Sequence, residues 1–111
     1  MADIIEGSRA YTLFEWTAQG AVRPIPMVRA EGVYFWDSAG KRYLDFASQL
    51  MNVNIGHGNR KVIEAIKAQA EELVYAYPGM ATRIRAEVGE KLAAIAPGRL
   101  TKTFFSLGGS E

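Results

Sequence analysis

The chain has 111 residues, which is enough for one small domain with a modest core and too few for two. Of these residues, 49% are apolar and 23% are charged, the balance of an ordinary soluble globular protein. The 13 basic and 12 acidic residues alternate in sign along the chain, so no basic face indicates nucleic acid or a membrane as a partner. The absence of cysteine excludes disulfides, thiolate catalysis and cysteine–metal sites.

Nothing in the sequence indicates export or membrane insertion. The first residues, MADIIEGSRAY, mix charges into a short apolar pair and do not resemble a signal peptide. No apolar run approaches the roughly 20 residues that a membrane-spanning helix needs. Together with the lack of cysteine, these features predict a soluble, cytoplasmic protein.

Residues 1–31 are expected to form an irregular arm. Pro24 and Pro26 hold one piece of it extended and exclude a helix there. Several side chains ahead of the prolines are too apolar for a free tail, so we expect them to pack against this chain or another: Tyr11, Leu13, Phe14 and Trp16.

A β-hairpin is predicted next, with residues 33–37 and 41–46 as its strands and SAG as its loop. Asp37 suits the first turn position, and Gly40 suits the positive φ that a three-residue loop requires. Asp45 is expected to belong to the edge of this hairpin. Aromatic side chains alternate onto both faces of the first strand, so the hairpin must be covered on both sides and is not the whole domain.

A long loop rich in amide side chains, residues 47–59, precedes two predicted helices. The first starts after Asn59, a good N-cap, and ends at the Pro-Gly pair 78–79. The second starts at Thr82 and ends at the Pro-Gly pair 97–98. Apolar side chains recur at helical spacing in both segments, which predicts one packed face on each.

Residues 101–107, TKTFFSL, are predicted to form a closing strand that runs into a Gly-Gly-Ser turn. The order loop, hairpin, helix, helix, strand indicates the front piece of a larger α/β domain. A strand, a glycine–serine turn and a helix N-terminus can together bind phosphate, because free N–H groups and a hydroxyl donate to the oxyanion. Taken alone, however, such a turn is more often only a turn.

Several motifs in order resemble class III aminotransferases. The pattern G-x-Y-x-x-D-x-x-G-x-x-Y-x-D-F covers residues 32–46, N-x-G-H follows at residues 54–57, and PGRLTKTFFSLGGSE resembles the family's next landmark. The resemblance extends from about Leu13 to the last residue. The segments WTAQG, PMVRAEG and SQLMNVNIGHG are most similar to the ω-amino acid and taurine-type members.

The resemblance implies an α/β fold, namely the N-terminal portion of a pyridoxal-phosphate-dependent transferase of fold type I. That portion contains a hairpin, two helices and the first strand of the large-domain sheet. The implied domains are an N-terminal arm at residues 1–31, a small-domain hairpin and helix at residues 32–80, and the start of the large cofactor-binding domain at residues 81–111. Family members run to several hundred residues, so the chain is expected to be an N-terminal fragment.

The implied cofactor is pyridoxal 5′-phosphate, with Gly109 and Ser110 as its phosphate-binding residues. Gly108 replaces a position that is often serine, so no role is carried over to it. The resemblance also implies two sets of residues near the active site. Trp16, Leu50 and Met51 would line the substrate pocket, with ordinary packing of the arm as the alternative for Trp16, and Tyr75, Tyr77 and Pro78 match a region near the neighbouring subunit's active site.

No catalytic residue is assigned within the chain. In the family, the lysine that forms the Schiff base and the acid that pairs with the pyridinium nitrogen come later in the sequence. The lysines here are expected to be solvated: Lys41, Lys61, Lys67, Lys91 and Lys102. His57 is expected to have a hydrogen-bonded structural role, and no second histidine or carboxylate cluster makes a metal site.

The intact protein is therefore expected to be a homodimer that moves an amino group from an amine or ω-amino acid to a keto acid. The chain alone is expected to be inactive. An accessory or interaction module derived from such an enzyme is the alternative, and a racemase or decarboxylating relative is a third possibility.

Overall fold

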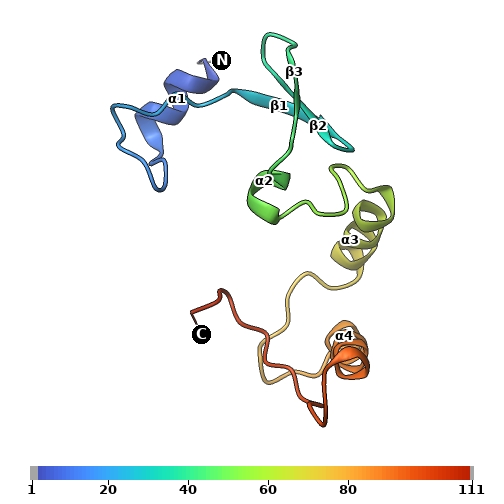
Figure 1. The fold of residues 1–111 in the computed structure, drawn as a ribbon. Coiled ribbons are helices and arrows are strands. Elements are labelled where there is room, and N and C mark those ends of the chain that lie inside the picture. Colours follow the sequence, from blue (N-terminus) through green and yellow to red (C-terminus); the bar gives the residue numbers. More distant parts are fainter. Residues whose placement is uncertain (1–2, 111) are drawn as a thin grey trace. The chain divides into compact units, whose positions relative to one another are not determined.

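The computed structural model describes residues 3–110, and the chain divides into two compact units, Met1–Lys67 and Ala68–Glu111. Figure 1 shows the elements in chain order. Their bounds are α1 Ile4–Tyr11, β1 Met27–Glu31, β2 Tyr34–Asp37, β3 Arg42–Leu44, α2 Ser48–Met51, α3 Arg60–Glu72 and α4 Arg83–Ile95. None of the helices among residues 3–110 is long and apolar enough to cross a bilayer.

The N-terminal arm is more regular than expected. Helix α1 forms because the Asp3 carboxylate accepts hydrogen bonds from the N–H groups of Ile5 (2.9 Å) and Glu6 (3.2 Å). The piece around the prolines is free of helix, as predicted. Strand β1 follows it, so the prediction of an irregular arm is wrong at both of its ends. A strand is stabilised by its neighbour, which a local pattern does not reveal.

The three strands form one antiparallel sheet in the order β1-β2-β3. The predicted β2–β3 hairpin is confirmed, and Gly40 has the positive φ, +80°, that its loop requires. Both faces of β2 carry aromatic side chains, as expected. On one face the Arg29 guanidinium lies 3.5 Å from the centroid of the Trp36 ring, and on the other Phe35 stacks on Tyr43 at 4.9 Å.

Helix α3 begins where it was predicted, because the Asn59 side-chain oxygen accepts from the N–H groups of Lys61 and Val62. It ends at Glu72, well before the Pro-Gly pair that was expected to stop it. The residues that follow, LVYAY, are largely β-branched or aromatic and lose side-chain freedom in a helix. The Gln69 side-chain amide also donates to the carbonyl oxygen of Leu73, which satisfies one acceptor at this end.

Helix α4 agrees with its prediction at both ends. The Thr82 hydroxyl accepts from the Arg85 N–H at 3.4 Å, and Gly98 has a φ of +63° shortly after the helix ends. The closing strand predicted over residues 101–107 does not form, since these residues join no sheet within the described part of the chain. A strand needs a neighbour for its N–H and C=O groups, and the described residues of Ala68–Glu111 contain no other strand.

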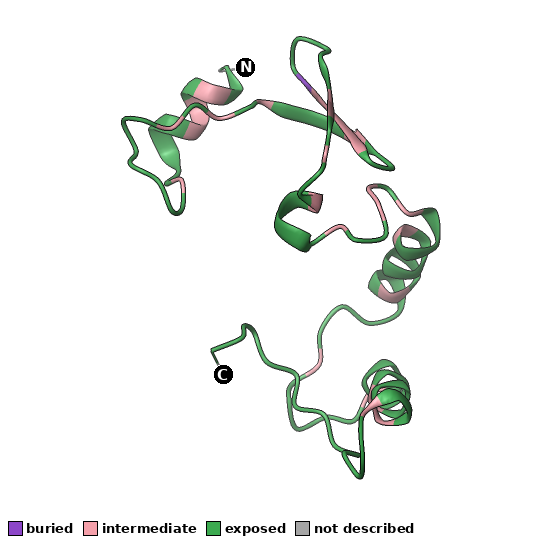
Figure 2. Cartoon of the chain, in the orientation of Figure 1, coloured by how far each residue is buried: buried purple, intermediate pink, exposed green. Residues whose placement is uncertain are grey.

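Few side chains are covered in either unit. Among the described residues no apolar side chain is buried, and Asp37 is the one residue in the buried class. Figure 2 shows exposed residues along every helix and along β1 and β3, whereas β2 is half-buried and ends at the buried Asp37. The apolar stripes of α3 and α4 therefore stay largely exposed among the described residues, whereas the aromatic side chains of β2 are half-covered by their neighbours in the sheet.

Candidate functional site

A left-handed turn, Ser48–Met51 (α2), follows the hairpin in the loop that was expected to be irregular. Its four residues have φ values of 52°, 45°, 59° and 62°, and none of them is glycine. An L-residue loses about 1–2 kcal/mol in this conformation relative to a right-handed one. Such a turn persists only where the surrounding structure imposes it, and strain of this kind gathers at functional sites.

Asp45 binds the start of the left-handed turn. Its Oδ1 accepts from the Gln49 N–H at 3.1 Å, and its Oδ2 lies 2.7 Å from Nε2 of His57. The two side chains of this Asp45–His57 pair are 5% and 10% exposed. Burial raises the pKa of the Asp45 carboxyl, but the hydrogen bonds from the Gln49 N–H and from His57 outweigh burial and leave the pKa below its usual value. The carboxylate is therefore held in its charged form.

His57 is itself fixed through its backbone. It exchanges two hydrogen bonds with Gly32, of 3.0 and 2.8 Å, in an isolated antiparallel bridge. Gly56 has a φ of +87°, and a Cβ on it would lie 3.2 Å from the Gly32 carbonyl oxygen, so this close approach requires glycine. The hydrogen-bonded structural role expected for His57 is confirmed. Asp45 lies at the edge of the hairpin, as expected, where its N–H donates to the Val33 carbonyl oxygen, and its side chain also joins the loop to His57, which was not expected.

Two amide side chains bind the other end of the left-handed turn. The Asn52 amide donates to the carbonyl oxygens of Gln49 (3.0 Å) and Leu50 (3.2 Å), and the Asn54 amide donates to that of Met51 (2.9 Å). These bonds satisfy carbonyl groups that a left-handed turn leaves free. Sequence reasoning missed the roles of both asparagines, although the amide-rich composition of the loop was the signal that could have indicated them.

The three residues predicted to line a substrate pocket share one backbone feature. Leu50 and Met51 lie in the left-handed turn, with exposed fractions of 54% and 68%. Trp16 has a φ of 57° and is 86% exposed, in a loop that Gln19 closes by bonding both the N–H and the carbonyl of Phe14. Among residues 3–110, these three account for most of the non-glycine residues with positive φ. Each of the three is thus an exposed apolar side chain on a residue with a strained, positive φ.

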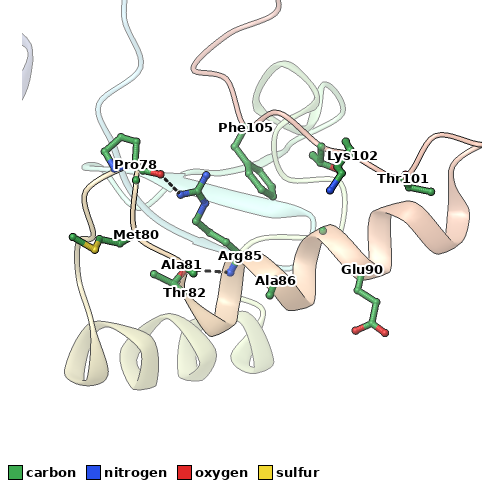
Figure 3. Close-up of a pocket in the computed structure, with 13 residues that line it drawn as sticks. Pro78, Met80, Ala81, Thr82, Arg85, Ala86, Glu90, Thr101, Lys102 and Phe105 are labelled. Atoms are coloured by element: carbon green, nitrogen blue, oxygen red, sulfur yellow. Dashed lines mark hydrogen bonds between the residues drawn. The ribbon is translucent and has the colours of Figure 1, made fainter.

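The second unit has a groove of about 550 Å³ between the turn at residues 78–82, helix α4 and residues 101–105. Figure 3 shows Arg85 between Pro78 and Phe105. The Arg85 guanidinium donates to the Pro78 carbonyl at 3.2 Å and lies 5.9 Å from the centroid of the Phe105 ring. Arg85 thus contacts both the turn at Pro78 and the extended segment at Phe105.

Gly109 and Ser110, the predicted phosphate-binding residues, lie in an exposed turn outside the residues that line this groove. A Cβ added to Gly109 would meet nothing within 4 Å, so the space beside the turn is open. A serine hydroxyl and the N–H groups of a turn are the donors that a phosphate prefers, and the residues present fit such a group. Within residues 3–110, no three His, Cys, Asp or Glu side chains gather into a possible metal site.

The hairpin, the loop with its left-handed turn and the glycine–serine turn all lie within one family match. Residues 17–111 match the model of the aminotransferase class-III family. The chain belongs to this family. A probable aminotransferase of Mycobacterium tuberculosis is 43% identical over 94 residues, which are 83% of this chain and 20% of that protein.

Two solved structures are similar to the chain in fold. An (S)-enantioselective ω-transaminase from Thermomicrobium roseum has a TM-score of 0.82 and 38% identity, covering 88% of this chain and 23% of that one. A taurine:2-oxoglutarate aminotransferase from Bifidobacterium kashiwanohense, solved with pyridoxal phosphate and glutamate, has a TM-score of 0.79 and 31% identity, covering 87% of this chain and 22% of that one. These relatives confirm the expected fold class, the N-terminal portion of a transaminase. The chain spans between 20% and 23% of their lengths.

Proposed function

We propose that the protein is an enzyme that transfers an amino group from an amine or ω-amino acid to a keto acid, with pyridoxal 5′-phosphate as its cofactor. One observation carries this proposal, namely that the family match over residues 17–111 takes in the hairpin, the left-handed turn and the glycine–serine turn in order. The similarity to an ω-transaminase and to a taurine aminotransferase supports an amine or ω-amino acid as the donor.

The residues of this chain would bind and orient rather than react. The Ser110 hydroxyl and the N–H groups of the turn at Gly109 would donate hydrogen bonds to the cofactor phosphate. Trp16, Leu50 and Met51 form apolar walls that hold the carbon skeleton of the amine and exclude water. Pyridoxal phosphate, when bound, supplies a ring that withdraws electrons from the reacting carbon. The lysine that carries the cofactor lies, in this proposal, beyond residue 111.

The proposal extends to the organisation of the protein. The arm at residues 1–31, the small-domain piece at 32–80 and the start of the cofactor domain at 81–111 are its proposed parts. The protein acts as a cytoplasmic homodimer with its active site at the subunit interface. The exposed Tyr75 and Tyr77 are available to such an interface.

The test is an amino-transfer assay on the intact protein reconstituted with pyridoxal phosphate. We expect an ω-amino acid or amine to be consumed only when a keto acid such as pyruvate or 2-oxoglutarate is present. Turnover of a chiral amino acid without any keto acid would instead identify a racemase. A protein that neither binds the cofactor nor turns over any amine would be an accessory module, and the proposal would be wrong.

A further inference from the structure

The left-handed turn needs support from outside itself, because each of its residues would relax toward right-handed backbone if released. Asn52 and Asn54 bind its carbonyl groups, but they belong to the same loop and can move with it. Asp45 is different, because its own N–H donates to the Val33 carbonyl oxygen at 2.9 Å and so ties it to the sheet. The Gln49 N–H is thereby bonded to a side chain whose backbone is fixed by the hairpin.

His57 completes this support from the other side. Its ring holds the second oxygen of Asp45, and its backbone is bridged to Gly32 between β1 and β2. The carboxylate therefore cannot rotate away from the Gln49 N–H without breaking a bond between two nearly buried side chains. The backbones of Asp45 and His57 are each hydrogen-bonded to the hairpin region, at Val33 and Gly32. The left-handed turn is bonded to the Asp45 carboxylate between them.

We propose that Asp45 and His57 are positioning residues that determine which amines the enzyme accepts, by holding the left-handed turn so that Leu50 and Met51 face the substrate. This inference rests on the proposed function, since it takes the side chains of Leu50 and Met51 to contact the amine. Neither Asp45 nor His57 touches the substrate. They act through the backbone of the turn, and without them Leu50 and Met51 would occupy several positions and the pocket would lose its shape.

The test uses the intact enzyme loaded with pyridoxal phosphate, an aliphatic amine with a small side chain and an aryl amine as donors, and pyruvate as acceptor. For Asp45→Ala we expect the ratio of kcat/KM between the two amines to change about tenfold, the scale of a reshaped apolar pocket. The change should appear mainly in KM, at unchanged cofactor content. Hydrogen exchange in the peptide covering residues 48–54 should become faster. If Asp45→Ala does not fold, Asp45→Asn replaces it, and a smaller shift in the same direction is expected because an acceptor for Gln49 remains.

Asp37→Ala is the matched control. Asp37 accepts a comparable set of hydrogen bonds at the hairpin loop, from Ala39, Lys41 and Tyr43, but none from the left-handed turn. We expect it to lower the melting temperature and to leave the amine ratio and the exchange of residues 48–54 unchanged. An unchanged ratio in Asp45→Ala, or an equal shift in Asp37→Ala, would overturn the inference.

The wild-type enzyme separates this inference from the proposed function. If it transfers no amino group from any donor, the proposed function fails, and the positioning of the turn is then judged on hydrogen exchange alone. Faster exchange of residues 48–54 in Asp45→Ala but not in Asp37→Ala would support the positioning role. Equal exchange in the two variants would contradict it.

Discussion

Asp37 illustrates how one side chain holds a hairpin loop. Its Oδ1 accepts from the N–H groups of Ala39 (3.0 Å) and Lys41 (2.9 Å), and its Oδ2 accepts from the Tyr43 hydroxyl (2.9 Å). Burial raises the pKa of the Asp37 carboxyl, but the Tyr43 hydroxyl and the two N–H groups outweigh burial, so the pKa lies below its usual value. Every one of these partners lies within six residues, which is why the position could be recognised from the sequence.

Substituting glycine for Gln49 tests whether the backbone of the left-handed turn is strained. Gln49 has a φ of 45° and a ψ of 57°, a conformation that glycine adopts without the steric penalty of a Cβ. In the intact protein we expect Gln49→Gly not to lower the free energy of unfolding, because the relieved strain of about 1–2 kcal/mol offsets the roughly 0.5–1 kcal/mol that glycine costs through the entropy of the unfolded chain. Ala68→Gly, inside the right-handed helix α3, should instead destabilise by about 1 kcal/mol.

Chemical denaturation of both variants measures these differences. Equal destabilisation by the two glycines would show that residue 49 is not held in a strained conformation.

Ser110 offers a test of the proposed phosphate contact. Ser110→Ala in the intact protein removes one hydroxyl donor to a charged group, and we expect cofactor binding to weaken by about 1–3 kcal/mol. Equilibrium dialysis of pyridoxal phosphate against the apo-protein measures the loss. Ser106→Ala is the control, because the Ser106 hydroxyl donates to the Gly108 carbonyl within the chain. Unchanged cofactor affinity in Ser110→Ala would argue against its proposed role.

At the scale of the elements, helices α3 and α4 begin on side-chain caps and carry apolar stripes that stay largely exposed. Arg83, the first residue of α4, donates to Glu72 (2.8 Å) and to Glu87 (3.1 Å). The pKa of the Arg83 guanidinium is raised, first by the hydrogen bond to Glu87 and then by the negative charges of Glu72 and Glu87. These charges are exposed, so they contribute little to stability beside the caps. The caps therefore decide where the helices start.

Asn59 is the cap to test. Asn59→Ala leaves the N–H groups of Lys61 and Val62 without their side-chain acceptor, and we expect the intact protein to lose about 1 kcal/mol of unfolding free energy. Asn59→Asp should retain most of the stability, because its carboxylate accepts the same bonds and suits the helix N-terminus. Thermal unfolding followed by circular dichroism compares the variants. An Asp variant as unstable as the Ala variant would contradict the capping role.

At the scale of the whole molecule, the dominant feature is apolar surface without cover. Large apolar side chains are more than half exposed in both units, among them Trp16 and Phe46 in the first and Tyr75 and Phe104 in the second. Burial of apolar area is the main favourable term in folding, and the described residues bury little of it. We therefore expect the sheet and helices to gain stability from apolar contacts outside the described residues.

Dye binding and unfolding of the isolated 111-residue polypeptide test whether this apolar surface is uncovered. We expect the polypeptide to bind a hydrophobic dye and to unfold without a cooperative transition, because no apolar core is formed among residues 3–110. The intact protein should bind little dye and unfold cooperatively. Calorimetry and dye fluorescence distinguish the two. A sharp transition in the isolated polypeptide would mean that it buries a core of its own.

The sequence by itself determined the features whose partners are close along the chain. The hairpin loop at Asp37 and Gly40 and the helix starts at Asn59 and Thr82 depend on hydrogen bonds or φ values that span only a few residues, so residue type and spacing were sufficient. The family resemblance rested on the same ordered motifs and is confirmed by the match. The phosphate role of Gly109 and Ser110 and the pocket role of Trp16, Leu50 and Met51 stay predictions.

The tertiary structure alone decided the features whose partners are distant. Strand β1 exists because β2 accepts and donates its hydrogen bonds, and residues 101–107 form no strand because the described residues give them no such neighbour. The left-handed turn depends on Asp45, which is held by His57 twelve residues later, and on a bridge from His57 back to Gly32. No local preference favours four left-handed residues in a row. Asp45, Asn52 and Asn54 bond the turn from nearby, and contacts of Asp45 and His57 with residues farther along the chain hold that support in place.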